Sequence, residues 1–195
     1  MIKLTELALV AVGYAFRERL DAYAAGDVAV LQMKNLDEAD VLCLVDTAPR
    51  INLPNLNERQ CIRKGDLLLR ARGQFHTAAE VTSDMARTIV AAPLMLIRVT
   101  STGLLPAYLR WFINQPQTQS TLTALAAGTH VRSINKVVLE NLQVPVPPLD
   151  KQQRIVSIAR LGEREQSLMR RLTECRAALL NARLMDNAQS EVISL

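Results

Sequence analysis

The chain has 195 residues and a mass of 21.6 kDa, and 49% of its residues are hydrophobic while 22% are charged. This composition supports a buried core and excludes global disorder, and the length suits one ordinary domain with or without an appendage. The apolar runs are far shorter than the roughly 20 residues of a membrane helix, and Glu6 interrupts the apolar N-terminal stretch, which is atypical of a secretory signal. We therefore expect a cytoplasmic protein without membrane association.

Cysteine and histidine are too sparse for a metal site. The three cysteines are widely spaced with no CxxC pair, and only two histidines are present. The P-loop, GxGxxG, GxSxG and HExxH patterns are all missing. The sequence therefore predicts reduced thiols, no metal, no cofactor and no catalytic activity.

Charge is unevenly distributed around a net value of +4. Residues 37–46 carry four acidic and no basic side chains, whereas residues 47–76 carry six basic against two acidic ones. Arginine, asparagine and glutamine side chains of this kind contact phosphates and base edges in nucleic acids. The alternative, which stays open, is a solvated loop whose arginines pair with the acidic stretch before it.

The first hundred residues read as short strands between turns. Strands are predicted over Val28–Met33, Val41–Val45, Asp66–Ala71 and Leu94–Val99, separated by turn residues such as Gly65, which with Asp66 indicates turn chemistry. Short strands with uneven loops are typical of an irregular β-rich domain rather than an alternating βαβ sheet.

Helices are predicted from about residue 104. Pro106 suits the first turn of a helix over Pro106–Ile113, Pro116 breaks it, and a second helix over Thr118–Ala127 ends at Gly128. A polar segment follows, and Ser133 is predicted to cap a further short helix.

Three prolines within 144–149 mark a domain boundary, because proline fits neither a helix interior nor a central strand. We expect a β-rich globular domain with small helices over 1–149, a long helix over 150–187 with Asp150 as N-cap, and a tail over 188–195. The predicted fold class is therefore α+β, with the long C-terminal helix forming a coiled coil.

The coiled coil is predicted from an a/d seam with alternating spacings of three and four residues. Glu165 occupies an a position, where a charge lowers stability but fixes register. A stripe of leucines on so long a helix needs a partner, although packing onto its own domain is the alternative. The seam residues, predicted for dimerisation, are Ile158, Leu161, Glu165, Leu168, Leu172, Cys175 and Leu179.

Several short segments of the sequence follow one another in an order that is typical of one protein family. They are Gly13–Phe16, Gly26–Leu36, Ile62–Gly73, Leu105–Asn114, Gly128 before a polar loop, and Leu142–Val156, whose proline-rich part and Gln-Arg-Ile-Val lead into the long helix. In this order they resemble the specificity (S) subunit of type I restriction-modification systems. The resemblance covers nearly the whole chain.

The resemblance implies a non-catalytic subunit that binds double-stranded DNA and positions a methyltransferase subunit, which methylates adenine, and in a complete system a motor-nuclease subunit. A usual S subunit has two target-recognition domains and two long helices, whereas this sequence looks like a half-length form with one of each. The resemblance therefore implies that two copies pair antiparallel through their helices and rebuild the usual architecture. We expect such a homodimer to read an inverted repeat, one half-site per copy.

Candidate DNA contacts come from two polar segments. The first set is Arg50, Asn55, Asn57, Arg59, Arg63, Arg70, Arg72, Gln74 and His76, and the second is Thr129, His130, Arg132, Ser133 and Lys136. Arg164, Arg170 and Arg171 flank the helix seam and are candidates for methyltransferase contact.

Two other functions stay open at this point. A coiled-coil adaptor or inhibitor related to S subunits keeps the seam but tolerates charge reversal of Arg50, Arg70 and Arg72. An independent nuclease or hydrolase requires catalytic activity from the chain alone, and the missing catalytic motifs argue against it.

Overall fold

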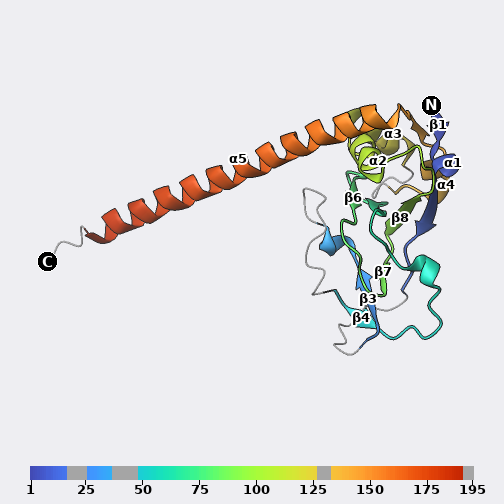
Figure 1. Cartoon of the computed structure of the whole chain (residues 1–195). Coiled ribbons are helices and arrows are strands. Elements are labelled where there is room, and N and C mark those ends of the chain that lie inside the picture. The colour runs from blue at the N-terminus through green and yellow to red at the C-terminus, as the bar shows by residue number, and fades with distance from the viewer. Residues whose placement is uncertain (17–25, 37–47, 127–132, 191–195) are drawn as a thin grey trace. The chain divides into compact units, whose positions relative to one another are not determined.

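The structure is a computed structural model that describes residues 1–16, 26–36, 48–126 and 133–190. The chain divides into two compact units, Met1–Gln153 and Arg154–Leu195. The first unit is a mixed α/β domain, and the second is formed by most of one long helix (Figure 1). The predicted fold class, an irregular β-rich domain followed by a long C-terminal helix, is confirmed.

Three small sheets make up the domain. The largest is antiparallel with the order β2 (Ala8–Val12), β8 (Leu94–Val99), β5 (Leu67–Arg70) and β6 (Ala78–Glu80). The second has β3 (Val28–Leu31) between antiparallel β4 (Arg50–Ile51) and parallel β7 (Thr88–Val90). β1 (Ile2–Lys3) pairs with β9 (Gln143–Val144), which ties the start of the chain to the segment before the long helix.

Burial explains the sequences of these strands. Central β5 contributes Leu67, Leu68 and Leu69, all fully buried, because both faces of the strand are covered. β2 lies at a sheet edge and keeps Leu9 64% exposed while Val10 is buried. The sheet with β3 and β7 lies at the end of the domain away from the helices (Figure 1).

The predicted strands are found where the structure describes them. β3 lies within Val28–Met33, β5 lies within Asp66–Ala71, and β8 matches Leu94–Val99. The predicted strand Val41–Val45 lies outside the described residues. The other described strands were not predicted, since β1, β4 and β9 are two residues long, β6 and β7 are three residues long, and β2 contains two alanines.

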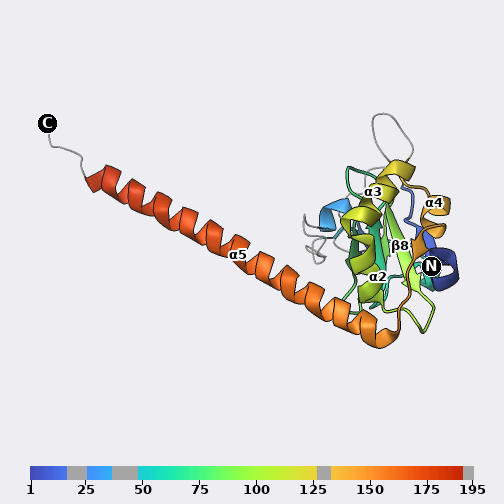
Figure 2. The same ribbon diagram turned by 90° about the horizontal axis from the view of Figure 1, so that it is seen from above.

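The helices of the domain are α1 (Leu4–Leu7), α2 (Pro106–Ile113), α3 (Pro116–Leu125) and α4 (Lys136–Glu140), with 3₁₀ turns η1 (Met33–Asn35) and η3 (Glu58–Gln60). Figure 2 shows α2, α3 and α4 around β8. The prediction of α2 is confirmed. The predicted start of the next helix at Thr118 is wrong, because Pro116 occupies its first turn, where no backbone N–H is required.

The predicted cap at Ser133 is also wrong. Asn135 caps α4, its Oδ1 accepting from the N–H of Val138 at 2.9 Å. Ser133 instead forms a β-bridge with Arg72, and an extended residue engaged in this way lies too early to cap a helix that begins at Lys136.

The long helix α5 spans Leu149–Ser190, about 63 Å at 1.5 Å per residue. Asp150 is not its N-cap, because the carbonyl of Pro148 already accepts from the N–H groups of Lys151 and Gln152. Asp150 lies in the first turn, where a carboxylate favours the helix dipole. The helix also continues past its predicted end at residue 187.

Gln152 fixes the first turn of α5 to the domain. Its side chain is fully buried, accepts from the N–H of Leu105 at 2.9 Å, and donates to the carbonyls of Gly103 and Pro147 at 2.8 and 2.7 Å. In contrast, the leucines of the seam are 45–71% exposed.

No helix in the described part of the chain is long and apolar enough to cross a bilayer.

Candidate nucleic-acid interface

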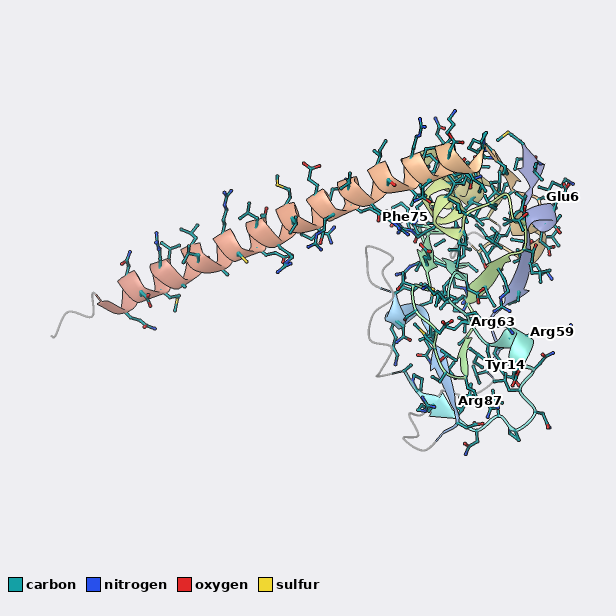
Figure 3. The ribbon with its side chains drawn as sticks, viewed as in Figure 1. Glu6, Tyr14, Arg59, Arg63, Phe75 and Arg87 are labelled. Atoms are coloured by element: carbon teal, nitrogen blue, oxygen red, sulfur yellow. The ribbon has the colours of Figure 1, made fainter. Side chains whose placement is uncertain are left out.

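Polar residues gather on two surfaces of the domain. The loop surface consists of Asn55, Asn57, Arg59 and Arg63, on the segment between β4 and β5. The hairpin surface consists of Arg72, Gln74, Phe75 and Ser133, at the connection between β5 and β6 and the chain beside it. Figure 3 shows Phe75 well apart from Arg59, so the first predicted set does not form a single patch.

The loop surface is held by Arg98, a residue of β8 that sequence reasoning missed. Its Nη1 donates to the carbonyl of Arg59 at 3.1 Å and its Nη2 donates to the carbonyl of Cys61 at 2.7 Å. Arg98 also forms an ion pair with the buried carboxylate of Asp66, in which Nε and Nη2 lie 2.8 and 2.6 Å from the two carboxylate oxygens. One guanidinium therefore joins the sheet to the backbone that carries Arg59.

Asp66 completes the support of the loop. Its Oδ2 also accepts from the N–H of Arg63 at 2.7 Å, which confirms the predicted turn chemistry at this residue. The hydrogen bond to Asp66 is the main cause that raises the pKa of Arg98 above its usual value, so the guanidinium remains charged. The loop is thus anchored while the side chains of Arg59 and Arg63 are exposed.

Asparagines on the loop surface differ in their roles. Asn57 caps η3 by accepting from the N–H of Arg59 at 3.0 Å, so its side-chain oxygen has a structural partner. Asn55 is exposed at the preceding turn.

Arg50 and Arg70 hold the backbone instead of facing a ligand freely. Arg50 donates to the carbonyls of Gly26 and Asp27 at 2.8 and 3.3 Å. Gly26 approaches this strand so closely that a Cβ would lie 2.3 Å from the backbone nitrogen of Ile51. Arg70 donates to the carbonyl of Leu36 at 2.8 Å. Both side chains are half-buried, and we assign them a structural role.

His76 is fully buried, which removes it from the candidate DNA contacts. Its Nδ1 lies 3.1 Å from the carbonyl of Arg70, and its backbone N–H and carbonyl both bond the side-chain amide of Gln119. The residue closes the base of the β5–β6 connection.

The hairpin surface brings the two predicted polar segments together. Arg72 and Ser133 form an antiparallel β-bridge, and the N–H of Ile134 donates to the carbonyl of Ala71 at 2.8 Å. Arg72 and Gln74 are exposed, and so is Lys136, which lies 3.5 Å from Glu140 on α4. Thr129, His130 and Arg132 lie outside the described residues. Phe75, 59% exposed, is the second residue that sequence reasoning missed.

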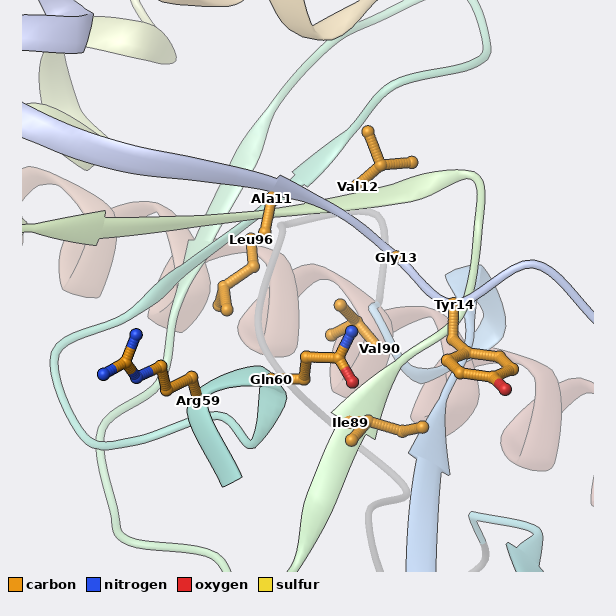
Figure 4. A pocket seen from close by; sticks show the side chains of 9 residues that line it. All are labelled: Ala11, Val12, Gly13, Tyr14, Arg59, Gln60, Ile89, Val90 and Leu96. Atoms are coloured by element: carbon orange, nitrogen blue, oxygen red, sulfur yellow. The ribbon is translucent and has the colours of Figure 1, made fainter. Parts of the chain in front are cut away.

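A cavity of about 200 Å³ lies beside the loop surface, between β2, β7 and η3 (Figure 4). Arg59 and Gln60 are its charged and amide-bearing lining residues, and Ala11, Ile89, Val90 and Leu96 are among the apolar ones. This volume is below the roughly 300 Å³ at which small-molecule sites begin. Nearby, burial raises the pKa of the Cys61 thiol above its usual value.

Solved structures with a similar fold come from type I systems. One, from a study of complex assembly and conformational transition of the type I restriction-modification system, has a TM-score of 0.68 and 19% identity and covers 93% of this chain and 42% of that chain. The HsdS subunit from Thermoanaerobacter tengcongensis has a TM-score of 0.66 and 19% identity and covers 96% and 44%. The S subunit from M. genitalium has a TM-score of 0.58 and 12% identity and covers 93% and 43%.

These likenesses show the fold, and the chain spans less than half the length of each of the three. Among curated proteins, none matches the sequence significantly. The model of the type I restriction modification DNA specificity domain matches residues 2–160, which is most of the chain. With both the fold and most of the sequence matched, the chain belongs to the family of type I restriction-modification DNA specificity domains.

Proposed function

We propose that this chain reads one half-site of a bipartite DNA target and positions methyltransferase subunits there. The observation that carries the proposal is the family match over residues 2–160, a range that includes both the loop surface and the hairpin surface. Exposed Arg59, Arg63 and Arg72 supply the charge that neutralises phosphates, and exposed amides supply groups that bond base edges. An anchored loop binds with a smaller loss of conformational entropy than a free one.

In this proposal the chain acts in the cytoplasm and carries out no chemistry itself. Methylation belongs to a methyltransferase subunit, and cleavage belongs to a motor-nuclease subunit where the system has one. Arg164, Arg170 and Arg171, all exposed on α5, are the proposed contacts to the methyltransferase.

Replacing Arg59 and Arg63 together by alanine is expected to weaken the binding of mixed-sequence duplex DNA and to flatten its salt dependence. Loss of two phosphate contacts reduces the slope of log K against log salt by about 1.8. Fluorescence anisotropy with a labelled 40-base-pair duplex across a salt series measures both quantities.

The control is the double change Lys3→Ala and Lys151→Ala, which removes the same charge from exposed residues outside both surfaces. We expect this variant to bind like the unchanged chain. If the unchanged chain does not bind at about 50 mM salt, even with a methyltransferase subunit present, DNA recognition is contradicted, because phosphate contacts are strong there.

We further propose that α5 pairs antiparallel with α5 of a second copy. Its seam is self-complementary, because an antiparallel pairing centred on residue 170 sets each a position against a d position. Leu161 then faces Leu179 of the second copy, Leu168 faces Leu172, and Glu165 faces Cys175. Exposure of 71% at Leu161 and 56% at Leu179 supports this, since burial of such side chains stabilises association.

A Glu165→Cys variant is expected to form a covalent dimer under mild oxidation. The antiparallel pairing places the new thiol opposite Cys175 of the second copy, within reach of a disulfide. Non-reducing electrophoresis detects the product at twice the chain mass.

The matched control is Glu163→Cys, which carries a thiol two residues away, outside the a and d positions. In the unchanged chain the two Cys175 residues lie about 15 Å apart along the axis, ten residues at 1.5 Å each, so no covalent dimer is expected. Efficient Cys175–Cys175 linkage in the unchanged chain would show parallel pairing and contradict the proposal.

A further inference from the structure

The connection between β5 and β6 carries the most exposed aromatic ring in the described part of the chain. Phe75 is 59% exposed, compared with 41% for Tyr14, and the other described aromatic side chains are buried or half-buried. Leaving a phenyl ring in water forgoes the stabilisation that its burial would give. The position thus favours a partner that covers the ring.

The backbone next to Phe75 is fixed on both sides of the connection. The side-chain amide of Gln119 accepts from the N–H of His76 at 2.8 Å and donates to its carbonyl at 3.0 Å. The backbone N–H of Arg70 donates to the carbonyl of Thr77 at 2.9 Å, which closes the hairpin. The amide of Asn114 pairs in the same way with Ala78, at 2.8 and 2.9 Å. Such preorganisation reduces the entropy that binding would remove.

The turn that precedes Phe75 depends on Gly73. Its φ of +133° lies in a region that L side chains rarely adopt, so glycine permits the reversal. Exposed Arg72 and Gln74 stand beside it in sequence, and the Arg72–Ser133 bridge adds a hydroxyl residue to the same surface. The hairpin surface therefore combines a cation, an amide, a hydroxyl and an aromatic ring.

This combination fits nucleic acid better than protein. An aromatic ring that anchors a protein interface usually lies within an apolar patch from which charged residues are depleted. Phe75 instead follows exposed Arg72 and Gln74 in the sequence, side chains of the types that contact phosphates and base edges. Apolar side chains inserted between base pairs unstack them and kink the duplex, while adjacent cations hold the backbone.

We propose that Phe75 inserts at a base step of duplex DNA and stacks on an exposed base. This inference rests on the proposed DNA recognition and adds a contact that reads the deformability of a base step as well as its edges. It also makes Phe75 a determinant of specificity, because pyrimidine–purine steps are the easiest to unstack.

The test uses the full chain and the duplex that it enriches from a randomised pool. In a Phe75→Trp variant, stacking on a base is expected to quench the new tryptophan fluorescence by at least half at saturating DNA. The unchanged chain supplies the baseline of Trp111, and Met169→Trp, at an exposed position in the middle of α5 outside the a and d positions, is the matched control that should not be quenched.

Affinity measurements complete the test. Phe75→Ala is expected to weaken binding of the enriched duplex about ten- to thirtyfold, from the lost burial of one ring, without changing the salt slope. Phe75→Trp is expected to retain the affinity of the unchanged chain.

DNA recognition and the stacking role of Phe75 are contradicted by different results. If the unchanged chain binds no duplex, the proposed function and this inference both fall. If it binds but Phe75→Ala matches it and Phe75→Trp is not quenched, DNA recognition stands and the stacking role is wrong. Loss of methyltransferase association in Phe75→Ala with unchanged DNA affinity would assign the ring to a protein interface and also overturn the inference.

Discussion

An Arg98→Ala variant is expected to lose about 3–5 kcal/mol of folding stability and at least tenfold in DNA affinity. The side chain of Asp66 is 3% exposed, so removal of the guanidinium leaves a buried carboxylate without its cation. The same change removes two hydrogen bonds to the carbonyls of Arg59 and Cys61, which releases the loop surface. Urea unfolding measures the first effect, and anisotropy with duplex DNA measures the second.

The matched control is Arg87→Ala. Arg87 forms an ion pair with Asp27 at 2.6 Å, the same distance as the closest contact between Arg98 and Asp66, but the two side chains are 49% and 38% exposed. Solvent screening limits such a pair to about 1 kcal/mol or less. Equal losses in the two variants would contradict the role assigned to burial at Asp66. An Arg98→Ala chain that is destabilised but binds DNA normally would show that the loop does not depend on Arg98 for function.

Glutamates at Leu168 and Leu172 are expected to convert the proposed dimer into a monomer. In the antiparallel pairing, Leu168 of each copy faces Leu172 of the other, so the double substitution removes four leucines from the interface. At about 1.5–3 kcal/mol for each buried leucine, the dissociation constant rises by more than 10⁴-fold. Light scattering at micromolar concentration should change from about 43 kDa, twice the chain mass, to 21.6 kDa.

Leu180→Glu provides the control for this experiment. Leu180 is 59% exposed, close to the 56% of the seam residue Leu179, but it lies outside the a and d positions. We expect this variant to remain a dimer. A monomeric unchanged chain would contradict self-pairing of α5, and dissociation by Leu180→Glu would place the contact on another face of the helix.

Elements with strong local signals could be predicted from the sequence. Pro106 and Pro116 delimit α2 because proline fits only the first turn of a helix, and the apolar run of β8 is long enough to be read directly. The prolines before Leu149, and a following segment without proline in which Gly162 is the one weak point, predict α5. The heptad pairing proposed for α5 stays a prediction.

The candidate site could be predicted only in part, because its organisation depends on contacts between distant residues. Leu67 pairs with Ile97 in the β5–β8 register, which puts Asp66 opposite Arg98, thirty-two residues away. The sequence signal for Arg98 is a charged residue inside a predicted apolar strand. Likewise, the aromatic ring of Phe75 between polar residues signalled the hairpin surface.

Residue type alone also overestimated the number of side chains open to DNA. His76 is buried by its bonds with Gln119, and Arg50 is engaged with Gly26. Local sequence cannot distinguish an arginine that binds backbone carbonyls from one that faces solvent, since both uses require the same side chain.

Selection from a randomised duplex pool by the full chain tests the central claim most directly. A symmetric pair of DNA-recognition domains presents the same reading surface twice, so we predict enrichment of an inverted repeat whose two halves are separated by a constant spacer. No enrichment over the input pool at about 50 mM salt would contradict DNA recognition, and enrichment of a single unrepeated motif would contradict its two-fold form.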